Sequence, residues 1–84
     1  MGASPNSNGT LTWLHHLFRG TTELEWGDVA RAAASLRRSR ALRPSAHAAR
    51  NLALLAPSAS EAWALYNEAW ELYRVSAVHT MRYN

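Results

Sequence analysis

Four histidines are the side chains of this 84-residue chain best suited to bind a metal ion, because the sequence contains no cysteine. His15 and His16 are adjacent, so on a helix their side chains diverge by about 100° and cannot hold one ion as a pair spaced four apart would. His47 and His79 lie far from them along the chain. The sequence therefore predicts no metal site.

Groups suited to catalysis are equally sparse. The sequence has no cysteine nucleophile and no glycine-rich loop that could cradle a phosphate. The carboxylates of Glu61, Glu68 and Glu71 recur at helical spacing, which is typical of a solvated helix face. We therefore expect a protein that is not an enzyme and that needs no cofactor.

Arginine is the one chemically active side chain that this chain carries in quantity. All nine cationic residues are arginines, and with six acidic residues they give a net charge of +3. Six of them lie between Asp28 and Glu61, a stretch without any acidic residue. Such a stretch can attract phosphate or an acidic partner, so a basic helical nucleic-acid-binding protein acting through Arg31–Arg50 is one alternative function. A chain rich in arginine and alanine and without lysine is also typical of GC-rich genomes, which offers a purely compositional explanation.

The elements that must position these side chains are predicted to be helices within one small domain, since 84 residues are too few for two cores. Residues 1–9 are small, polar and turn-rich, as in a flexible N-terminal tail. Thr10 is the predicted N-cap of a first helix over Leu11–Trp26. Gly20 inside this helix costs about 1 kcal/mol relative to alanine, so we predict that a neighbouring helix approaches the backbone closely there.

Helix-breaking and capping residues in the middle of the chain predict two further helices. Gly27-Asp28 supplies a break and a new N-cap for a helix over Val29–Leu42, which Pro44 stops. Ser45 then caps a short third helix over about Ala46–Ala56.

The fourth predicted helix begins with a capping box at Ser58–Glu61 and reaches about Ala77. Residues 76–84 are either an extension of this helix or a separate cap. The connections between helices are short, so residues 10–75 are expected to form two antiparallel helical hairpins. No strand pattern competes with this all-α fold.

The fourth helix contains an internal repeat, because Glu61–Asn67 and Glu68–Arg74 agree at five of seven positions. Leucine, alanine, tyrosine and tryptophan therefore cover about half of the helix circumference, which is wider than an amphipathic stripe requires. Packing against the second and third helices accounts for part of this face. We expect another part to stay uncovered, and we predict self-association or partner docking there through Trp63, Trp70 and Tyr73.

The second predicted helix carries a pattern of small and aliphatic residues known from one repeat family: Gly27-Asp28, Ala32, Leu36, Ser39 and Pro44. This pattern resembles the second helix of a tetratricopeptide (TPR) repeat. The following repeat is carried by Asn51-Leu52-Ala53, Ala62, Tyr66 and Ala69. The resemblance covers about residues 10–74 and implies two repeats of an α-solenoid. The period is shortened, since Ala32 and Ala62 are 30 residues apart instead of about 34.

A TPR-like array implies recognition of another protein or peptide in the groove formed by its first and third helices. The residues left over for this groove, once the core is assigned, are His16, Thr21, His47, Arg50, Asn51 and Leu54. The family's well-known clamp for a terminal carboxylate is matched here by Asn51 alone, so that specificity is not expected. Arg40 stands where the family usually has an aliphatic residue, and its stem is expected to pack while its head reaches solvent.

The function expected from these observations is that of a TPR-type protein–protein interaction module, a scaffold or adaptor, with a homo-oligomer through the fourth helix as one form. The run Arg50–Ala53 also resembles the repeat tail of large bacterial proteins with a mutarotase-like front half, so a detached tail of a carbohydrate-acting protein is a second alternative. No run of about 18 apolar residues and no signal peptide occurs, so no membrane association and a cytoplasmic location are expected.

Overall fold

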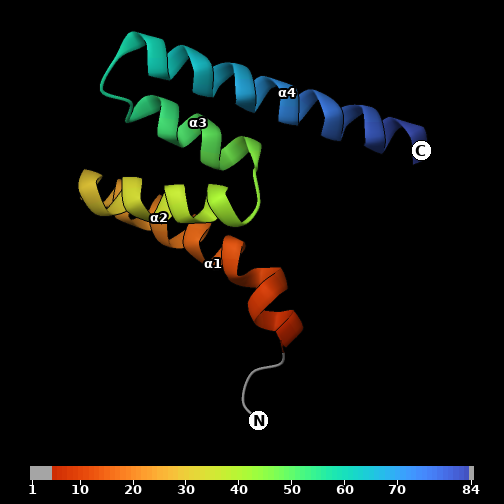
Figure 1. Ribbon diagram of the computed structural model, residues 1–84, viewed down its shortest axis with the longest axis horizontal. Coiled ribbons are helices and arrows are strands. Elements are labelled where there is room, and N and C mark those ends of the chain that lie inside the picture. Colours follow the sequence, from red (N-terminus) through yellow and green to blue (C-terminus); the bar gives the residue numbers. More distant parts are fainter. Residues whose placement is uncertain (1–4, 84) are drawn as a thin grey trace.

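The structure, a computed structural model, describes the backbone of residues 5–83 and the side chains of residues 11–78. Within that range the chain forms four α-helices and no strand: α1 (Pro5–Glu25), α2 (Val29–Leu42), α3 (Ala46–Leu54) and α4 (Ala59–Tyr83). As Figure 1 shows, α1 packs against α2 and α3 packs against α4, while α2 and α3 join the two pairs. The predicted all-α fold of two helical hairpins is confirmed.

The loops between the helices supply the N-caps that the sequence predicts. Asp28, Ser45 and Ser58 each accept a hydrogen bond of 3.2 Å, through a side-chain oxygen, from the backbone N–H three residues further along the chain. Gly27 has a φ of +85°, a left-handed conformation that glycine adopts without strain. Its N–H donates to the Leu24 carbonyl at 3.0 Å, which helps to close the end of α1.

Three helix boundaries differ from the predicted ones. α1 begins at Pro5, a residue that favours the first helical position, so Thr10 lies inside the helix and does not cap it. Part of the expected N-terminal tail is therefore helical, and residues 1–4 lie outside the described residues. α3 ends at Leu54, slightly earlier than predicted. α4 continues beyond Ala77 to Tyr83, which resolves the open question in favour of an extension.

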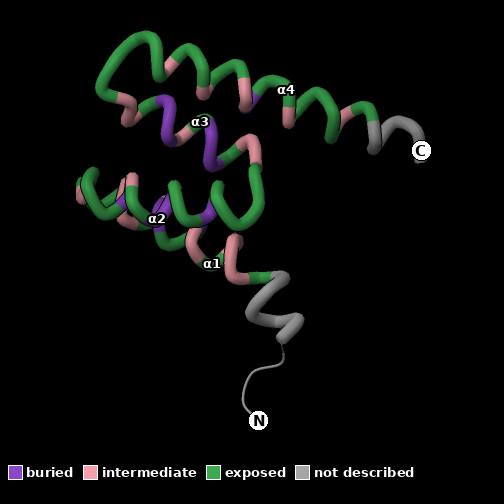
Figure 2. Tube along the Cα trace, in the orientation of Figure 1, coloured by how far each residue is buried: buried purple, intermediate pink, exposed green. Residues whose placement is uncertain are grey.

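The hydrophobic core lies between the two hairpins. Leu17, Leu36, Ala48 and Leu52 form its buried centre, and partly buried side chains pack around it: Trp13, Leu14, Leu55 and Leu65. Figure 2 shows that the buried positions concentrate in α2, α3 and the adjoining part of α1, whereas most of α4 is exposed. All four helices therefore contribute to one core, although unequally.

The helices α1 and α2 approach closely at Gly20, as the sequence predicts. A Cβ atom added at Gly20 would lie 2.8 Å from Cγ of Leu36 and 3.3 Å from the Ala32 carbonyl oxygen. Polar bonds join the same two helices, because Ser39 is fully buried and its hydroxyl donates to the Trp13 carbonyl at 2.8 Å. The Arg43 guanidinium lies 5.0 Å from the centre of the Trp13 ring, a cation–π contact near the end of α2.

One ion pair links α2 with α4. Nε of Arg40 donates to Oε2 of Glu68 at 2.7 Å, and the second guanidinium nitrogen donates to the other carboxylate oxygen. Arg40 therefore has an acidic partner for its exposed head, which the sequence pattern did not indicate. Because α3 has 9 residues and α4 has 25, α3 is about 14 Å long and covers only part of an α4 of about 38 Å. The C-terminal part of α4 projects past α3 (Figure 1).

Candidate functional site

The internal repeat of α4 gives this helix two apolar faces instead of one. The inward face carries small and aliphatic residues that are buried or half-buried: Ala62, Leu65, Ala69 and Leu72. The outward face carries four large aromatic residues, which we call the aromatic stripe: Trp63, Tyr66, Trp70 and Tyr73. Their exposed fractions are 69%, 42%, 60% and 62%, respectively. The prediction that part of the wide apolar arc stays uncovered is confirmed.

The aromatic stripe follows one line along α4 because its residues are spaced by three, four and three positions. That is the spacing at which a helix presents a seam to a second helix. The rings of Trp70 and Tyr73 lie 6.4 Å apart between centroids and are tilted by 32°, so they form a joint aromatic surface. Large rings in this arrangement offer a partner a wide apolar contact area, and few rotatable bonds have to be fixed when it binds.

A cavity of about 370 Å³ lies beside the stripe, between α3 and α4. It is lined by residues of both helices: Ala46, His47, Arg50, Tyr66, Ala69, Trp70 and Tyr73. The α4 side of the lining consists of Ala69 and the aromatic residues, while α3 contributes Ala46 and two polar residues, His47 and Arg50. Arg50 makes no ion pair with any residue of the described part of the chain. This cavity therefore combines an apolar floor with an available positive charge.

The structure brings some of the sequence-predicted site residues together and separates others. His47 and Arg50 meet Trp70 and Tyr73 in the cavity between α3 and α4. Trp63 lies on the same stripe, nearer the beginning of α4. From the sequence, His47 and Arg50 were expected on one surface and the aromatic residues on another; they meet because α3 and α4 pack side by side as a hairpin.

The remaining predicted residues lie elsewhere, and the two helices expected to form their groove, α1 and α3, touch only slightly. His16 faces α2 in a different groove. The Thr21 hydroxyl donates to the Leu17 carbonyl of its own helix at 2.9 Å. Asn51 is half-buried and Leu54 is exposed on α3, and neither lines the cavity with Arg50.

The arginine-rich stretch does not form one continuous basic surface. Arg31 and Arg38 line a groove between α1 and α2, whereas Arg37 and Arg40 lie beside a second cavity that also involves α3 and α4. Arg50 belongs to the cavity between α3 and α4. The helical repeat of α2 thus distributes neighbouring arginines to different sides of the molecule.

The groove between α1 and α2 was not predicted from the sequence, although its signal is present there. His16, Arg19 and Glu23 are spaced by three and four residues on α1, and Arg31, Ser35 and Arg38 repeat that spacing in reverse order on α2. Each set therefore shares one helix face. The sequence does not show that these two faces lie opposite each other, because that depends on how α1 packs on α2.

Histidine, aspartate and glutamate residues do not cluster into a group able to hold a metal ion anywhere in the described part of the chain. The hydrogen bonds that the Glu68 carboxylate accepts from Arg40 lower the pKa of Glu68 and raise the pKa of Arg40. These shifts have a structural cause, the link between α2 and α4, and do not indicate an acid–base pair for catalysis.

None of the helices, as far as their residues are described, is long and apolar enough to cross a membrane. Comparisons of the chain with protein-family models, with curated proteins and with solved structures found no match.

Proposed function

We propose that this protein is a helical recognition module that binds a segment of another protein along the aromatic stripe of α4 and in the adjoining cavity. The observation that carries the proposal is the exposure of four large aromatic side chains in one line beside a cavity lined by Arg50, whose guanidinium makes no ion pair with the described residues. Contiguous exposed apolar surface of this kind marks an interaction site. The resemblance to TPR repeats supports the same class of function, and a cytoplasmic location remains part of the proposal.

The partner that fits this surface best is an amphipathic helix with an acidic residue at one side. Aromatic side chains at a three–four spacing pack against apolar anchors spaced in the same way on a second helix. Arg50 lines the cavity and makes no ion pair with the described residues, so a carboxylate on the partner would find an accessible cation there. The partner is therefore expected to combine apolar anchors with a glutamate or aspartate.

The test is a selection from a displayed library of helix-forming peptides on the immobilised full chain. Enriched peptides should carry the pattern of apolar anchors and one acidic residue. Aromatic residues at the centre of an interface commonly contribute 2 kcal/mol or more, so Trp70→Ala should weaken the best peptide by about thirtyfold. Arg50→Gln should weaken only the peptides that carry the acidic residue.

A matched control is available on the other hairpin, where Phe18 of α1 and Trp26 just after it are also large and exposed, at 62% and 81%. Phe18→Ala and Trp26→Ala should leave peptide affinity unchanged within about twofold, as expected for residues outside an interface. Equal losses in these controls and in Trp70→Ala would contradict the proposal. A dimer in sedimentation that dissociates on Trp70→Ala would instead identify a second copy of the chain as the occupant of the stripe.

A further inference from the structure

The groove between α1 and α2 lies on the other hairpin from the aromatic stripe and has a different chemistry. It measures about 450 Å³ and is lined mainly by polar and charged side chains: His16, Arg19, Glu23, Arg31, Ala34, Ser35 and Arg38. Three guanidinium groups and one carboxylate therefore share one concave surface. The lining carries an excess of positive charge even before His16 is protonated.

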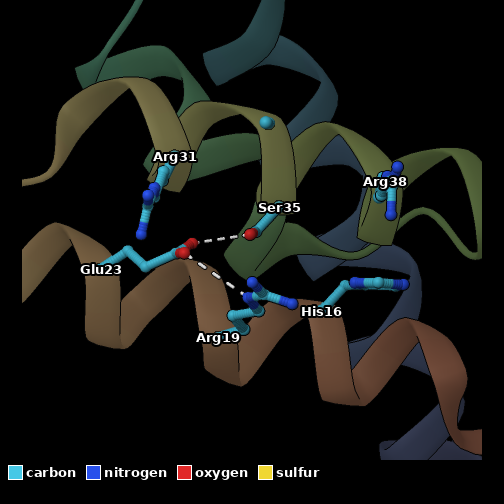
Figure 3. A pocket seen from close by; sticks show the side chains of 7 residues that line it. His16, Arg19, Glu23, Arg31, Ser35 and Arg38 are labelled. Carbon is cyan, nitrogen blue, oxygen red and sulfur yellow. Dashed lines mark hydrogen bonds and ion pairs between the residues drawn. The ribbon is translucent and has the colours of Figure 1, made fainter.

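Glu23 occupies one end of this groove and already has its partners. Its carboxylate accepts a hydrogen bond of 2.6 Å from the Ser35 hydroxyl and lies 3.5 Å from Nε of Arg19. Figure 3 shows the Glu23 carboxylate on the side of the groove near Arg31, with Arg19 beside it. The Glu23 side chain is only 12% exposed and its two carboxylate oxygens already face Ser35 and Arg19.

The opposite end of the groove holds His16 and Arg38, and neither has an acidic partner among the residues whose side chains the structure describes. Figure 3 shows the Arg38 guanidinium above the His16 ring, with no bond drawn to either. Among the described residues Arg38 makes no ion pair, whereas Arg40 and Arg74 each pair with a glutamate. Arg19 lies on α1 between Glu23 and His16 (Figure 3), so its positive charge acts on this end although its Nε faces Glu23. Like charges that converge in a groove favour an anion between them.

We propose that the end of the groove formed by His16, Arg19 and Arg38 binds a phosphate monoester dianion. A tetrahedral phosphate offers several acceptor oxygens, which match N–H donors that come from two helices. A single carboxylate would neutralise less of the positive charge. The ligand is therefore a phosphorylated small molecule or a phosphorylated serine or threonine of a peptide, and both present the same group.

The pKa of His16 supports a positive environment at this site. Burial lowers this pKa from its ordinary value of 6.5, and the positive charges of Arg38, His15 and Arg19 lower it further. The remaining charged groups of the groove are Arg31 on α2 and Glu23 on α1. A bound dianion would reverse the effect of the three cations and raise the pKa, because the imidazolium would gain an opposite charge.

The first experiment titrates inorganic phosphate into the full chain at constant ionic strength and follows the His16 ring and arginine Nε signals by NMR. Binding should saturate and should move His16, Arg19 and Arg38 together. Arg38→Gln should weaken binding by about tenfold, as expected for a hydrogen bond between charged groups. Arg37→Gln is the matched control, because Arg37 is the neighbouring exposed arginine on another side of α2, and it should change affinity by less than about twofold.

The second experiment separates the protonation of His16 from that of the ligand. Sulfate stays a dianion between about pH 8 and pH 5, whereas phosphate loses charge in this interval. Sulfate affinity should therefore rise by about fivefold as pH falls through the pKa of His16, and His16→Gln should abolish the rise. Circular dichroism of each variant confirms that the helices are retained.

Three comparisons decide the outcome and the source of the ligand. A phosphoserine peptide that binds at least tenfold more tightly than phosphate and than its unphosphorylated form would identify a protein source, while equal affinity for phosphoserine and phosphate would identify a small molecule. Equal losses in Arg37→Gln and Arg38→Gln would overturn the proposal, since they indicate diffuse attraction. Binding of a short single-stranded RNA with equal losses in both variants would overturn it in favour of a nucleic-acid surface.

Discussion

Gly20 illustrates how a single residue sets the distance between two helices. The Cγ and Cδ2 atoms of Leu36 would lie 2.8 and 3.0 Å from a Cβ atom at this position. Leu36 is fully buried, so neighbouring atoms limit any movement of its side chain. The cost of a glycine inside α1 is therefore offset by the packing that the missing side chain allows.

At the residue scale we predict that Gly20→Ala lowers the free energy of unfolding by about 1–2 kcal/mol. Alanine gains about 1 kcal/mol in helix propensity, but overpacking of a dense core costs more. Gly20→Val should cost more than Gly20→Ala because the added atoms meet the same leucine. Chemical denaturation followed by circular dichroism measures both values. A more stable Gly20→Ala protein would contradict the close approach of α1 and α2.

Gly27 provides the contrast, since a Cβ atom there would have no neighbour within 4 Å and only its φ of +85° is unfavourable. Gly27→Ala should cost about 1 kcal/mol, and Gly27→Asn should cost less because asparagine tolerates the left-handed region. The two glycines are thus required for different reasons, steric in one case and conformational in the other.

At the scale of elements, each capping residue in a loop stabilises only the helix that follows it. The ion pair between Arg40 and Glu68 instead connects two helices. Asp28, Ser45 and Ser58 each satisfy a backbone N–H in the first turn of the helix that follows. Arg40 and Glu68 are 28 residues apart and join α2 to α4, which otherwise meet mainly through their contacts with α3. Losing a cap should therefore weaken one helix, whereas losing the ion pair should weaken the docking of the two hairpins.

We predict that this ion pair makes stability depend on pH. The hydrogen bonds from Arg40 lower the pKa of Glu68 from its ordinary value of 4.5. The stabilisation is therefore fully present above about pH 4.5 and is lost as pH falls through the lowered pKa. Because the Arg40 side chain is 43% exposed, solvent limits the coupling energy to about 1 kcal/mol.

A double-mutant cycle with Arg40→Gln and Glu68→Gln measures this coupling from the free energies of unfolding. The coupling should be present near neutral pH and absent below the pKa of Glu68. The control cycle uses Arg74 and Glu71, which pair within one turn of α4 and connect no second helix. It should show a weaker coupling. Equal coupling at neutral and acidic pH would contradict a role for the charge of Glu68.

At the scale of the whole molecule, the core is unevenly placed. Buried residues concentrate in α2 and α3, while α4 contacts a much shorter helix and carries its large aromatic residues outside (Figure 2). Val75 and Val78 are exposed further along α4, beyond the residues that line the cavity with α3. This half of α4 carries apolar residues typical of a buried helix, but no other described helix covers them. That arrangement agrees with a role in binding.

We predict that hydrogen exchange reflects this uneven support. Backbone amides of residues 71–78 in α4 should exchange faster than those of α2 and α3, because few tertiary contacts oppose the opening of this segment. A peptide bound to the aromatic stripe should slow exchange in the same segment and leave α1 unchanged. Uniform protection along α4 in the free protein would show that the segment is stable by itself and would contradict this prediction.

The sequence by itself determined the helices, most of their ends, the three caps and the close approach at Gly20. The helices, their ends and the caps depend on interactions among residues within a few positions of one another, and the close approach was indicated by the cost of a glycine inside a helix, although its partner Leu36 lies on another helix. The wide apolar arc of α4 was also visible in the repeat of Glu61–Asn67 and Glu68–Arg74.

Only the tertiary structure decided which surfaces these helices create. The meeting of Arg50 with Trp70, the pairing of Arg40 with Glu68 and the groove that holds His16 all join segments far apart in the chain. The spacing of side chains along one helix shows which residues share a face. Which residues of a neighbouring helix contact that face depends on the rotation and length of the neighbour. In this protein, the different lengths of α3 and α4 leave part of α4 uncovered, and the packing of α1 on α2 creates the groove that holds His16.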